Sequence, residues 1–581
     1  MDILFPVWEM PATASLAQSN TMPQKPVFSR APILQMTNCA AANGTVRSQD
    51  NRIRRLYQKA DQWNAFPRMW EGLFRIACLI KNKPLEEPVT QRIYEAIQDT
   101  EDGSFTGPFD EQIYTARALF AVFEYNTDKE ILKRIALWLR FVEVEFDRCT
   151  RESDVLYQPA DLMELLVRYY LATGMKSVLR ICSKLRAEAF DWTTSLHTFQ
   201  QSIPIDNHKI LPSEINISVR PENLEYDEKE KLINHAEMLA DGMRYTLYSG
   251  LYSGHSQDLS SGHILWEYLL KHHHAVCGGT TSNPFLSGTA SDQPVNNLAL
   301  AAWIEAFGSQ LVLPESEWAL DEMIRIVNNG MADCLEREEI PLFQLINNPT
   351  GISQATDNKI VLYARITRAV AAAYRYAVMA TVSGIRINYL LPAKFMFMIG
   401  KQPVVLCTDR SYAVFQCKKS FNASVEIYMS RTENADVSLT RNGTTTVRKH
   451  NESKIRDGIF LRTENAWCNE DGYHLEQNNT IITEECHHQG LCFFAGNQLL
   501  TVCASEDHYA YAVTEIPRQD NAKTIITLAE IPKWKISRKH LPDIPVLPIP
   551  ADTGKNFEMI PYHLNKNRIA MFPKAGNACL K

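Results

Sequence analysis

The spacing of apolar residues is helical over the first two thirds of the chain, from about Ile53 to about Ala380. The clearest segment runs from Asp161 to Gly174, where the apolar residues recur at intervals of three and four and share one face: Leu162, Leu165, Leu166 and Tyr169. Asp161 is typical of a helix N-cap, and Gly174 is typical of the residue that follows a last turn. This region is therefore expected to consist of amphipathic helices.

Similar spacing recurs throughout the region and predicts about twelve helices. The stronger segments are Trp70–Leu79, Tyr114–Tyr125, Ile131–Phe146, Val178–Phe190, Ile233–Tyr248, Leu265–His273, Asn297–Leu311, Trp318–Met331 and Tyr363–Ala380, and the weaker ones are Ile53–Gln62 and Val89–Gln98. Many connections between them are short, as in antiparallel helical hairpins. Twelve paired helices can form an open solenoid or a closed double ring. Because no repeat of about 30 to 45 residues is visible, the closed ring is favoured.

The pattern changes after about Ile385, where short runs of β-branched and aromatic residues replace the helical spacing. The first predicted strands are Val404–Cys407, Tyr412–Gln416, Ser424–Met429 and Val437–Thr440. Asn442-Gly443 predicts a type I′ hairpin turn, and further strands follow as far as Thr527 at a spacing typical of a β-sandwich. The Pro-rich segment Leu541–Pro550 indicates an extended strap. The predicted architecture is α and then β.

Four parts of the chain are predicted from these changes in pattern. They are an N-terminal extension over residues 1–50, a helical toroid over 51–384, an antiparallel β-sandwich over 385–535, and a C-terminal strap over 536–581 that packs on the sandwich.

Charge and cysteine usage narrow the function classes. The 581 residues carry a net charge of −7 and show no concentrated run of Lys or Arg, whereas a general nucleic-acid binder needs a basic footprint. No apolar stretch reaches the roughly 20 residues that span a bilayer, and Met1–Trp8 does not read as a secretory signal. The 13 cysteines are scattered without a Cys-x-x-Cys pair. We therefore expect a cytoplasmic protein that binds neither nucleic acid nor membrane.

Several segments, in consistent order, resemble the β-L-arabinofuranosidase-like glycoside hydrolases (the former DUF1680 group). Phe557–Arg568 carries an Ile-Pro-Tyr followed by Asn-Arg, which is similar to the closing signature of that family. Other family-like segments precede it in the expected order: Gln98–Phe105, His235–Tyr245, Trp266–Gly279, Trp318–Asn329 and Gly384–Leu390. The resemblance covers nearly the whole chain after residue 50, and it implies an (α/α)6 helical toroid followed by a β-sandwich.

The resemblance also implies a retaining hydrolysis in which a cysteine is the nucleophile. In the family, zinc held by a Glu and three cysteines lowers the pKa of the attacking thiol, and a second Glu is the acid/base. The family's Cys-Cys-x-x-Asn-x-x-Arg run falls on Val361–Arg368, where Arg368 is retained and both thiols are replaced by aliphatic residues. The family's Gly-x-Glu-x-Cys motif falls on Asp292–Ala299, and its acid/base region falls on Thr281–Gly288, without matching Glu or Cys. We therefore expect no metal and no cofactor.

The remaining polar residues near these motifs give the candidate site. We predict His235 and Asp292 as catalytic residues, and pocket-binding roles for Tyr114, Tyr245, His273, Gln293 and Asn296. Each has a structural alternative. His235 can be a buried structural histidine, and Asp292 can cap the helix that follows it. The imidazoles around His273 can complement a helix C-terminus, and the tyrosines can belong to the core.

Three functions remain open from the sequence. The first is a glycosidase-like scaffold repurposed for metal-independent chemistry on a small molecule, such as a biosynthetic cyclisation, isomerisation or elimination in the toroid pocket. The second is a zinc-free glycoside hydrolase, which needs two carboxyl groups facing each other across the cavity. The third is a non-catalytic sugar-binding protein. The expected partner is a small molecule or a sugar, and a homodimer is left open.

Overall fold

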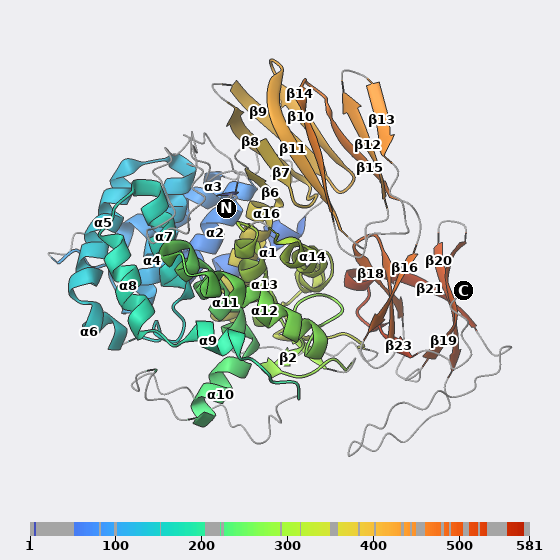
Figure 1. The fold of residues 1–581 in the computed structure, drawn as a ribbon, viewed down its shortest axis with the longest axis horizontal. Helices are drawn as coiled ribbons and strands as arrows, with labels where there is room; N and C mark the ends of the chain where they lie inside the picture. Colours follow the sequence, from blue (N-terminus) through green and yellow to red (C-terminus); the bar gives the residue numbers. More distant parts are fainter. Residues whose placement is uncertain are drawn as a thin grey trace.

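The structure is a computed structural model of the whole chain, with helices in the first part and sheets in the second (Figure 1). It describes residues 5–6, 51–80, 83–97, 102–151, 153–203, 221, 226–290, 293–313, 315–348, 358–380, 384–399, 402–430, 435–441, 444–448, 459–477, 481–486, 490–503, 511–520, 523–530 and 555–573. The predicted hairpin turn at Asn442-Gly443 and the Pro-rich segment Leu541–Pro550 lie outside these residues, as does most of the predicted N-terminal extension.

The helical part consists mainly of α-helices. The helices are α1 (Asn51–Asp61), α2 (Pro67–Leu79), α3 (Lys83–Glu95), α4 (Phe109–Asn126), α5 (Lys129–Val144), α6 (Phe146–Arg151), α7 (Ala160–Thr173), α8 (Val178–Glu188), α9 (Trp192–His197), α10 (Tyr226–Asn234), α11 (Ala236–Ser253), α12 (Ser256–His272), α13 (Asn297–Gln310), α14 (Glu317–Arg325), α15 (Met331–Glu336) and α16 (Lys359–Ala377). The π-helix Ile326–Gly330 joins α14 to α15. None of the helices described is long and apolar enough to cross a bilayer.

Six of the described helices contact one another in a closed cycle. In chain order these are α2, α4, α7, α11, α13 and α16, and α16 returns to α2. Most of them are followed by a partner that packs on the outside of the cycle, as in the pairs α2–α3, α4–α5, α7–α8, α11–α12 and α13–α14. We call these six helices the inner helices.

Small residues allow the inner helices to approach closely. A Cβ added to Gly308 in α13 would lie 2.3 Å from the Tyr376 ring in α16, and one added to Gly72 in α2 would lie 2.2 Å from the Thr367 hydroxyl. Both contacts are far closer than van der Waals distance, so only glycine fits at these crossings. Helix α7 ends as predicted, because Gly174 adopts a left-handed conformation with φ of 69° and donates its N–H to the Tyr170 carbonyl.

The strands from Val378 onward, together with one short N-terminal strand, form three larger sheets. The first has the order β1 (Phe5–Pro6), β6 (Val378–Ala380), β7 (Gly384–Ile387), β11 (Phe421–Met429), β14 (Ile459–Trp467). The second has the order β13 (Thr444–Arg448), β12 (Ala435–Arg441), β15 (Gly472–Gln477), β10 (Tyr412–Cys417), β9 (Gln402–Asp409), β8 (Ala393–Ile399). Neighbours pair antiparallel except β7 and β11, which are parallel.

The third sheet stands apart from the first two in Figure 1. Its order is β16 (Ile481–Cys486), β17 (Gly490–Ala495), β18 (Gln498–Cys503), β21 (Lys555–Pro561), β20 (Lys523–Glu530), β19 (Tyr511–Asp520), with β22 (Arg568–Ile569) on β18 and β23 (Phe572–Pro573) on β17. Four short strands lie within the helical part and form two small ladders: β2 (Ser282–Asn283), β3 (Phe285–Leu286), β4 (Pro294–Asn296) and β5 (Phe343–Leu345).

The sheets are held by two hydrophobic cores. The first and second sheets meet through aromatic contacts, since Phe415 of β10 lies 5.0 Å from Trp467 of β14 and 5.3 Å from Phe421 of β11. The third sheet has a separate core, whose largest members are Phe493 and Phe572. The predicted order of a helical part followed by a β part is confirmed.

The third sheet is joined to the helical part by polar contacts. Arg325 of α14 forms two hydrogen bonds of 2.9 Å with the carboxylate of Glu484 in β16. Asn329 of the π-helix accepts a hydrogen bond from the Leu499 N–H and donates one to the Asn497 carbonyl. The Arg325–Glu484 pair is charge-assisted, which is the strong kind of hydrogen bond. Together with the Asn329 contacts it anchors the sheet to the helices.

Candidate functional site

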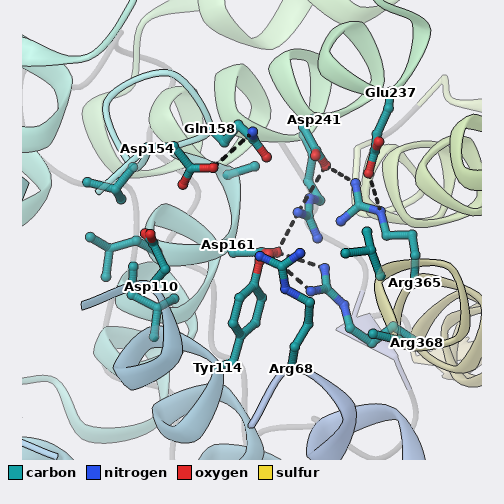
Figure 2. Close-up of a pocket in the computed structure, with 17 residues that line it drawn as sticks. Arg68, Asp110, Tyr114, Asp154, Gln158, Asp161, Glu237, Asp241, Arg365 and Arg368 are labelled. Atoms are coloured by element: carbon teal, nitrogen blue, oxygen red, sulfur yellow. Dashed lines mark hydrogen bonds and ion pairs between the residues drawn. The ribbon is translucent and has the colours of Figure 1, made fainter. Parts of the chain in front are cut away.

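A pocket opens where the N-terminal ends of five inner helices converge (Figure 2). Its volume is about 50 Å³. The lining residues come from α2, α4, the loop before α7, α7, α11 and α16: Arg68, Asp110, Ile113, Tyr114, Asp154, Val155, Gln158, Ala160, Asp161, Leu162, Glu237, Asp241, Arg244, Val361, Ala364, Arg365 and Arg368. The pocket is therefore lined mainly by charged and polar groups, which favour a polar ligand.

Three of the acidic residues hold equivalent positions in their helices. Asp110, Asp161 and Glu237 are each the second residue of an inner helix, in α4, α7 and α11 respectively. The N-terminal end of a helix carries a partial positive charge and unpaired N–H groups, so it favours negative charge. The local sequence thus places carboxyl groups around the pocket by the same rule that places acidic residues in first helical turns.

Below the pocket, the centre of the helical part is filled by one connected network of buried ion pairs. It joins six arginines and six carboxylates: Arg75, Arg117, Arg168, Arg244, Arg365, Arg368, Glu71, Glu124, Asp161, Glu164, Asp241 and Glu305. We call this the ion-pair network. Buried charges are tolerated only when they are paired and hydrogen-bonded in this way.

Asp161 connects the network to the pocket. Its carboxylate accepts two hydrogen bonds from Arg368, of 2.8 and 3.0 Å, and a third of 2.5 Å from Arg244. Burial alone would raise the pKa of Asp161, but the guanidinium groups of Arg368, Arg244 and Arg117 outweigh it and hold the pKa well below its usual range. Asp161 is therefore an ionised hydrogen-bond acceptor in the pocket at every ordinary pH.

Asp110 and Asp154 form a carboxyl pair at one side of the pocket. Burial, and then the neighbouring carboxylate and its hydrogen bond, raise the pKa of Asp110 to about 7. Burial also raises the pKa of Asp154, which accepts a 3.1 Å hydrogen bond from the Gln158 amide. Two carboxyl groups this close cannot both ionise readily. The pair therefore shares one proton near neutral pH, held mainly by Asp110, and can act as a proton donor.

Glu237 lies across the pocket from this pair (Figure 2). Burial is the main cause that raises the pKa of Glu237, and the guanidinium of Arg365 partly opposes it. The Arg365 Nε lies 3.7 Å from the Glu237 carboxylate. The pocket thus holds carboxyl groups on two opposite sides.

Tyr114 and Arg68 complete the wall between the two sides. The Arg68 guanidinium lies 4.8 Å from the centre of the Tyr114 ring, which is a cation–π contact. Burial raises the pKa of Tyr114 to about 12, so its hydroxyl stays neutral and can donate or accept a hydrogen bond. Among the residues predicted from the sequence as site residues, Tyr114 is the one that lines this pocket.

His235 lies next to the start of α11 but is not among the residues that line the pocket. It is the N-cap residue of α11, two positions before Glu237, and its ring packs edge-on against Phe285 at 5.7 Å. Burial lowers the pKa of His235 to about 4, so the imidazole is neutral near pH 7. Within the described residues, its Nδ1 atom is buried without a hydrogen-bond partner. A catalytic role for His235 stays a prediction.

The other predicted site residues lie in the surrounding framework. His273 is buried and is hydrogen-bonded at both ring nitrogens, to the Gln201 carbonyl and the Gly288 N–H. Asn296 caps α13 by accepting the Leu298 N–H, which is the capping role considered for Asp292. Tyr245 is buried in the core, and Gln293 is the residue directly before β4. Asp292 lies outside the described residues.

The zinc that the family resemblance implies does not fit the residues of this pocket. At the position of the paired thiols, Val361 lines the pocket and Leu362 is buried in the core. The charged groups that face the same space from α16 are the guanidinium groups of Arg365 and Arg368. Zinc requires thiolate, imidazole or free carboxylate donors. Among the residues that the structure describes, no group of three or more such side chains is placed to hold a metal ion.

The sequence did not predict Asp110 or Asp154 as site residues. The predicted helix at Tyr114–Tyr125 begins five residues too late, because α4 starts at Phe109 directly after Pro108. Asp110 therefore lies outside the predicted helix. Proline before a first turn followed by Asp-Glu is a helix-start signal and could have placed Asp110. Asp154 lies in an irregular loop between α6 and α7, and its approach to Asp110 is a tertiary contact that no local pattern carries.

Comparisons with known proteins give a similar fold and no close relative. No protein-family model matches the chain, and no curated protein matches it in sequence. A solved structure described as a glycoside hydrolase matches with a TM-score of 0.65 at 12% identity, covering 92% of this chain and 96% of the other. Two further matches have a TM-score of 0.59. One is Ara127N-Se, a GH127 β-L-arabinofuranosidase from Geobacillus stearothermophilus T6, at 12% identity with coverage of 92% and 96%.

The other is the GH127 β-arabinofuranosidase BT3674, at 10% identity with coverage of 99% and 98%. The fold resemblance expected from the sequence segments is thus confirmed over more than nine tenths of the chain. Identities of 10–12% are consistent with the divergence of the catalytic motifs. At this identity the likeness concerns the fold, and the function must be argued from the pocket.

Proposed function

We propose that this protein is an enzyme that carries out metal-independent acid–base chemistry on a small, hydroxylated molecule. The reaction takes place in the pocket of an (α/α)6 toroid. It is an isomerisation, an elimination or a cyclisation, of the kind that forms one step of a biosynthesis. The observation that carries the proposal is the carboxyl pair Asp110–Asp154, whose shared proton is available near pH 7. A positioned acid with a pKa near the working pH is what efficient proton transfer needs. The closed cycle of inner helices supports the toroid.

The polarity of the pocket supports a hydroxylated ligand rather than an apolar one. The lining offers ionised acceptors such as Asp161, donors such as Arg68, and the neutral hydroxyl of Tyr114. An apolar substrate would displace water from these groups without pairing with them, which costs free energy. A sugar or sugar-like molecule can satisfy them through its hydroxyl groups. In this proposal Asp110 donates the proton, Tyr114 and Arg68 orient the substrate, and Asp161 accepts a hydrogen bond from it.

A second candidate is zinc-free glycoside hydrolysis. Glu237 favours it, because this carboxyl group lies across the pocket from the Asp110–Asp154 pair (Figure 2). Glycoside hydrolases use two carboxyl groups on either side of the scissile bond, one as acid and the other as base or nucleophile. The fold shared with GH127 β-L-arabinofuranosidases supports this candidate equally. The non-catalytic sugar-binding protein remains the outcome in which binding occurs without conversion.

One NMR experiment separates these functions. The full-length protein is incubated in D₂O with L-arabinose and, separately, with methyl L-arabinofuranoside. Deuterium incorporation at a carbon, or a new product without release of methanol, supports the isomerisation or elimination. Release of methanol supports hydrolysis, and shift changes without conversion indicate binding alone. Failure of both probes to bind would contradict the proposed ligand class.

The role of the carboxyl pair is tested with two isosteric variants. Asp110→Asn removes the shared proton and is expected to lower kcat by about 10²- to 10⁴-fold, with a much smaller change in KM. Glu130→Gln neutralises an exposed first-turn acid of α5 and is the matched control with unchanged kcat. Equal activity of the two variants would contradict the assignment of Asp110 as the proton donor. A cytoplasmic location and a homodimer stay proposals, to be checked by fractionation and by light scattering.

A further inference from the structure

Two cysteine side chains meet on the third sheet, far from the pocket. Cys486 is the last residue of β16, and Cys492 lies in the neighbouring strand β17. In the antiparallel register Glu484 faces Cys492, and Cys486 faces Gly490. Cys486 and Cys492 are therefore diagonal neighbours whose side chains share one face of the sheet. Their Sγ atoms lie 2.7 Å apart, which brings two thiols into direct contact.

The two thiols differ in their access to solvent. Cys492 is fully buried, whereas Cys486 is partly exposed at the end of its strand. A small thiol reagent can reach Cys486 from solvent but not Cys492. Burial and the adjacent Cys486 also raise the pKa of Cys492 well above its usual range, so Cys492 reacts only after Cys486 has been modified.

We propose that Cys486 and Cys492 form a reversible disulfide in the folded protein and that this bond fastens strand β16 to β17. The oxidant is a low-molecular-weight disulfide. The Cys486 thiolate attacks one of its sulfur atoms, forms a mixed disulfide and releases one small thiolate. Cys492 then loses its proton to solvent and attacks the Cys486 Sγ atom, which forms the protein disulfide and releases the second thiolate. Two protein thiols are oxidised, and one small disulfide is reduced to two small thiols.

The position of β16 gives this bond a structural consequence. In the strand order of the third sheet, β16 lies at the edge and pairs with β17 alone among the described strands. The same strand carries Glu484, which binds Arg325 of the helical part through two hydrogen bonds. A covalent link between β16 and β17 therefore also holds the strand that joins the third sheet to the helices.

The test uses the reduced, full-length protein in glutathione buffers of increasing oxidised fraction. Free thiols are blocked with N-ethylmaleimide, and the digested protein is analysed by mass spectrometry. A peptide pair linked through Cys486 and Cys492 is expected to replace both blocked peptides. In Cys492→Ser the glutathione adduct at Cys486 is expected to accumulate, because the second step is lost. Hydrogen exchange of residues 481–486 is expected to slow on oxidation of the wild-type protein.

The matched control is Cys503→Ser, which removes an exposed thiol at the end of β18 and should form the same linked peptide. Two results would overturn the proposal. One is that Cys486 of the wild-type protein keeps its glutathione adduct, or stays reduced, at the most oxidising ratio. The other is that the disulfide forms while hydrogen exchange of residues 481–486 is unchanged. Circular dichroism of each variant confirms that a negative result does not reflect loss of the fold.

Discussion

Asp110 and Asp161 occupy the same position in two inner helices, line the same pocket, and have opposite protonation behaviour. Each is the second residue of its helix, and each is largely buried against protein. Yet the pKa of Asp110 is raised to about 7, whereas that of Asp161 is held well below its usual range. Helix position therefore does not set the charge. The neighbours do, because several guanidinium groups surround Asp161, whereas burial and the Asp154 carboxyl group outweigh the single nearby guanidinium of Arg68 at Asp110.

The comparison extends to the two regions that these residues represent. In the ion-pair network below the pocket every carboxylate is bound to arginines from other helices, so that region is fixed in charge and geometry. At the carboxyl pair, Arg68 supplies the nearby positive charge but does not outweigh burial and the second carboxyl group, so the pair keeps a proton near pH 7. Asp161 belongs to the ion-pair network and also lines the pocket, so the pocket combines groups of fixed charge with a pair that can exchange a proton.

The largest effect is expected from breaking the ion-pair network. Arg368→Met leaves the carboxylates of Asp161 and Glu305 without their bidentate partner. Removing one partner of a buried pair leaves an uncompensated charge, so we expect a loss of about 3–5 kcal/mol in the free energy of unfolding. Urea denaturation monitored by circular dichroism measures it. The first transition midpoint is the quantity to compare, because a chain with several cores need not unfold in two states.

The matched control for this loss is Arg180→Met. Arg180 is a fully exposed arginine that pairs with Glu143 on the surface, so its removal should leave the midpoint unchanged. If Arg368→Met were as stable as this control, the network would not be the fixed region described above. Adding Glu305→Gln to Arg368→Met should recover part of the loss, because the network then again holds equal numbers of guanidinium and carboxylate groups.

A smaller effect on the free energy of unfolding, this time a gain above neutral pH, is expected when Asp110 of the carboxyl pair is replaced. The folded-state pKa of Asp110 is about 7, above the roughly 3.9 of an unfolded aspartate. Between these values the folded protein holds a proton that the unfolded chain releases, so this residue's contribution to stability falls as pH rises from about 4 to about 7. Asp110→Asn should flatten this slope, making the variant more stable than wild type at pH 8 by on the order of 1–2 kcal/mol after allowance for solvent screening.

Urea midpoints at pH 5, 6, 7 and 8 measure the slope, with Glu130→Gln as the control that keeps it. Asp154→Asn sharpens the comparison, because it removes the like charge and should lower the pKa of Asp110. If the Asp110→Asn and wild-type curves ran parallel, the pair would not hold a proton in this range, and the distinction between Asp110 and Asp161 would fail.

Patterns within short segments of the sequence predicted the helices and strands but not the Asp110–Asp154 carboxyl pair. The helix from Asp161 to Gly174, the change to strands and the fold resemblance could be read from apolar spacing and ordered motifs, because these signals lie within short segments. Asp161 itself was read as an N-cap, but its carboxylate binds arginines of α11 and α16 instead. Such contacts join residues up to 207 positions apart, and no periodicity records them.

The same limit explains why the sequence predicted only part of the candidate site. Family motifs directed attention to His235 and the segment around Asn296, where local capping is what the structure shows for Asn296. The carboxyl pair depends on the loop between α6 and α7 folding back over α4, which is a property of the closed cycle of helices rather than of either segment. Tyr114 was predicted because it matches a position of the family resemblance, and the structure places it in the lining of the pocket.

The smallest effect is expected at Tyr114, which stands between the two kinds of carboxyl group. Tyr114→Phe removes a neutral hydroxyl from the pocket wall but keeps the ring against the Arg68 guanidinium. Stability should therefore be unchanged, while affinity for a hydroxylated ligand falls by about 0.5–1.5 kcal/mol, or roughly two- to tenfold. NMR titration with L-arabinose measures the affinity, and urea denaturation checks the stability. An unchanged affinity would mean that the ligand contacts the carboxyl groups but not the Tyr114 hydroxyl. A loss of stability would mean that the hydroxyl supports the fold around Asp161 instead.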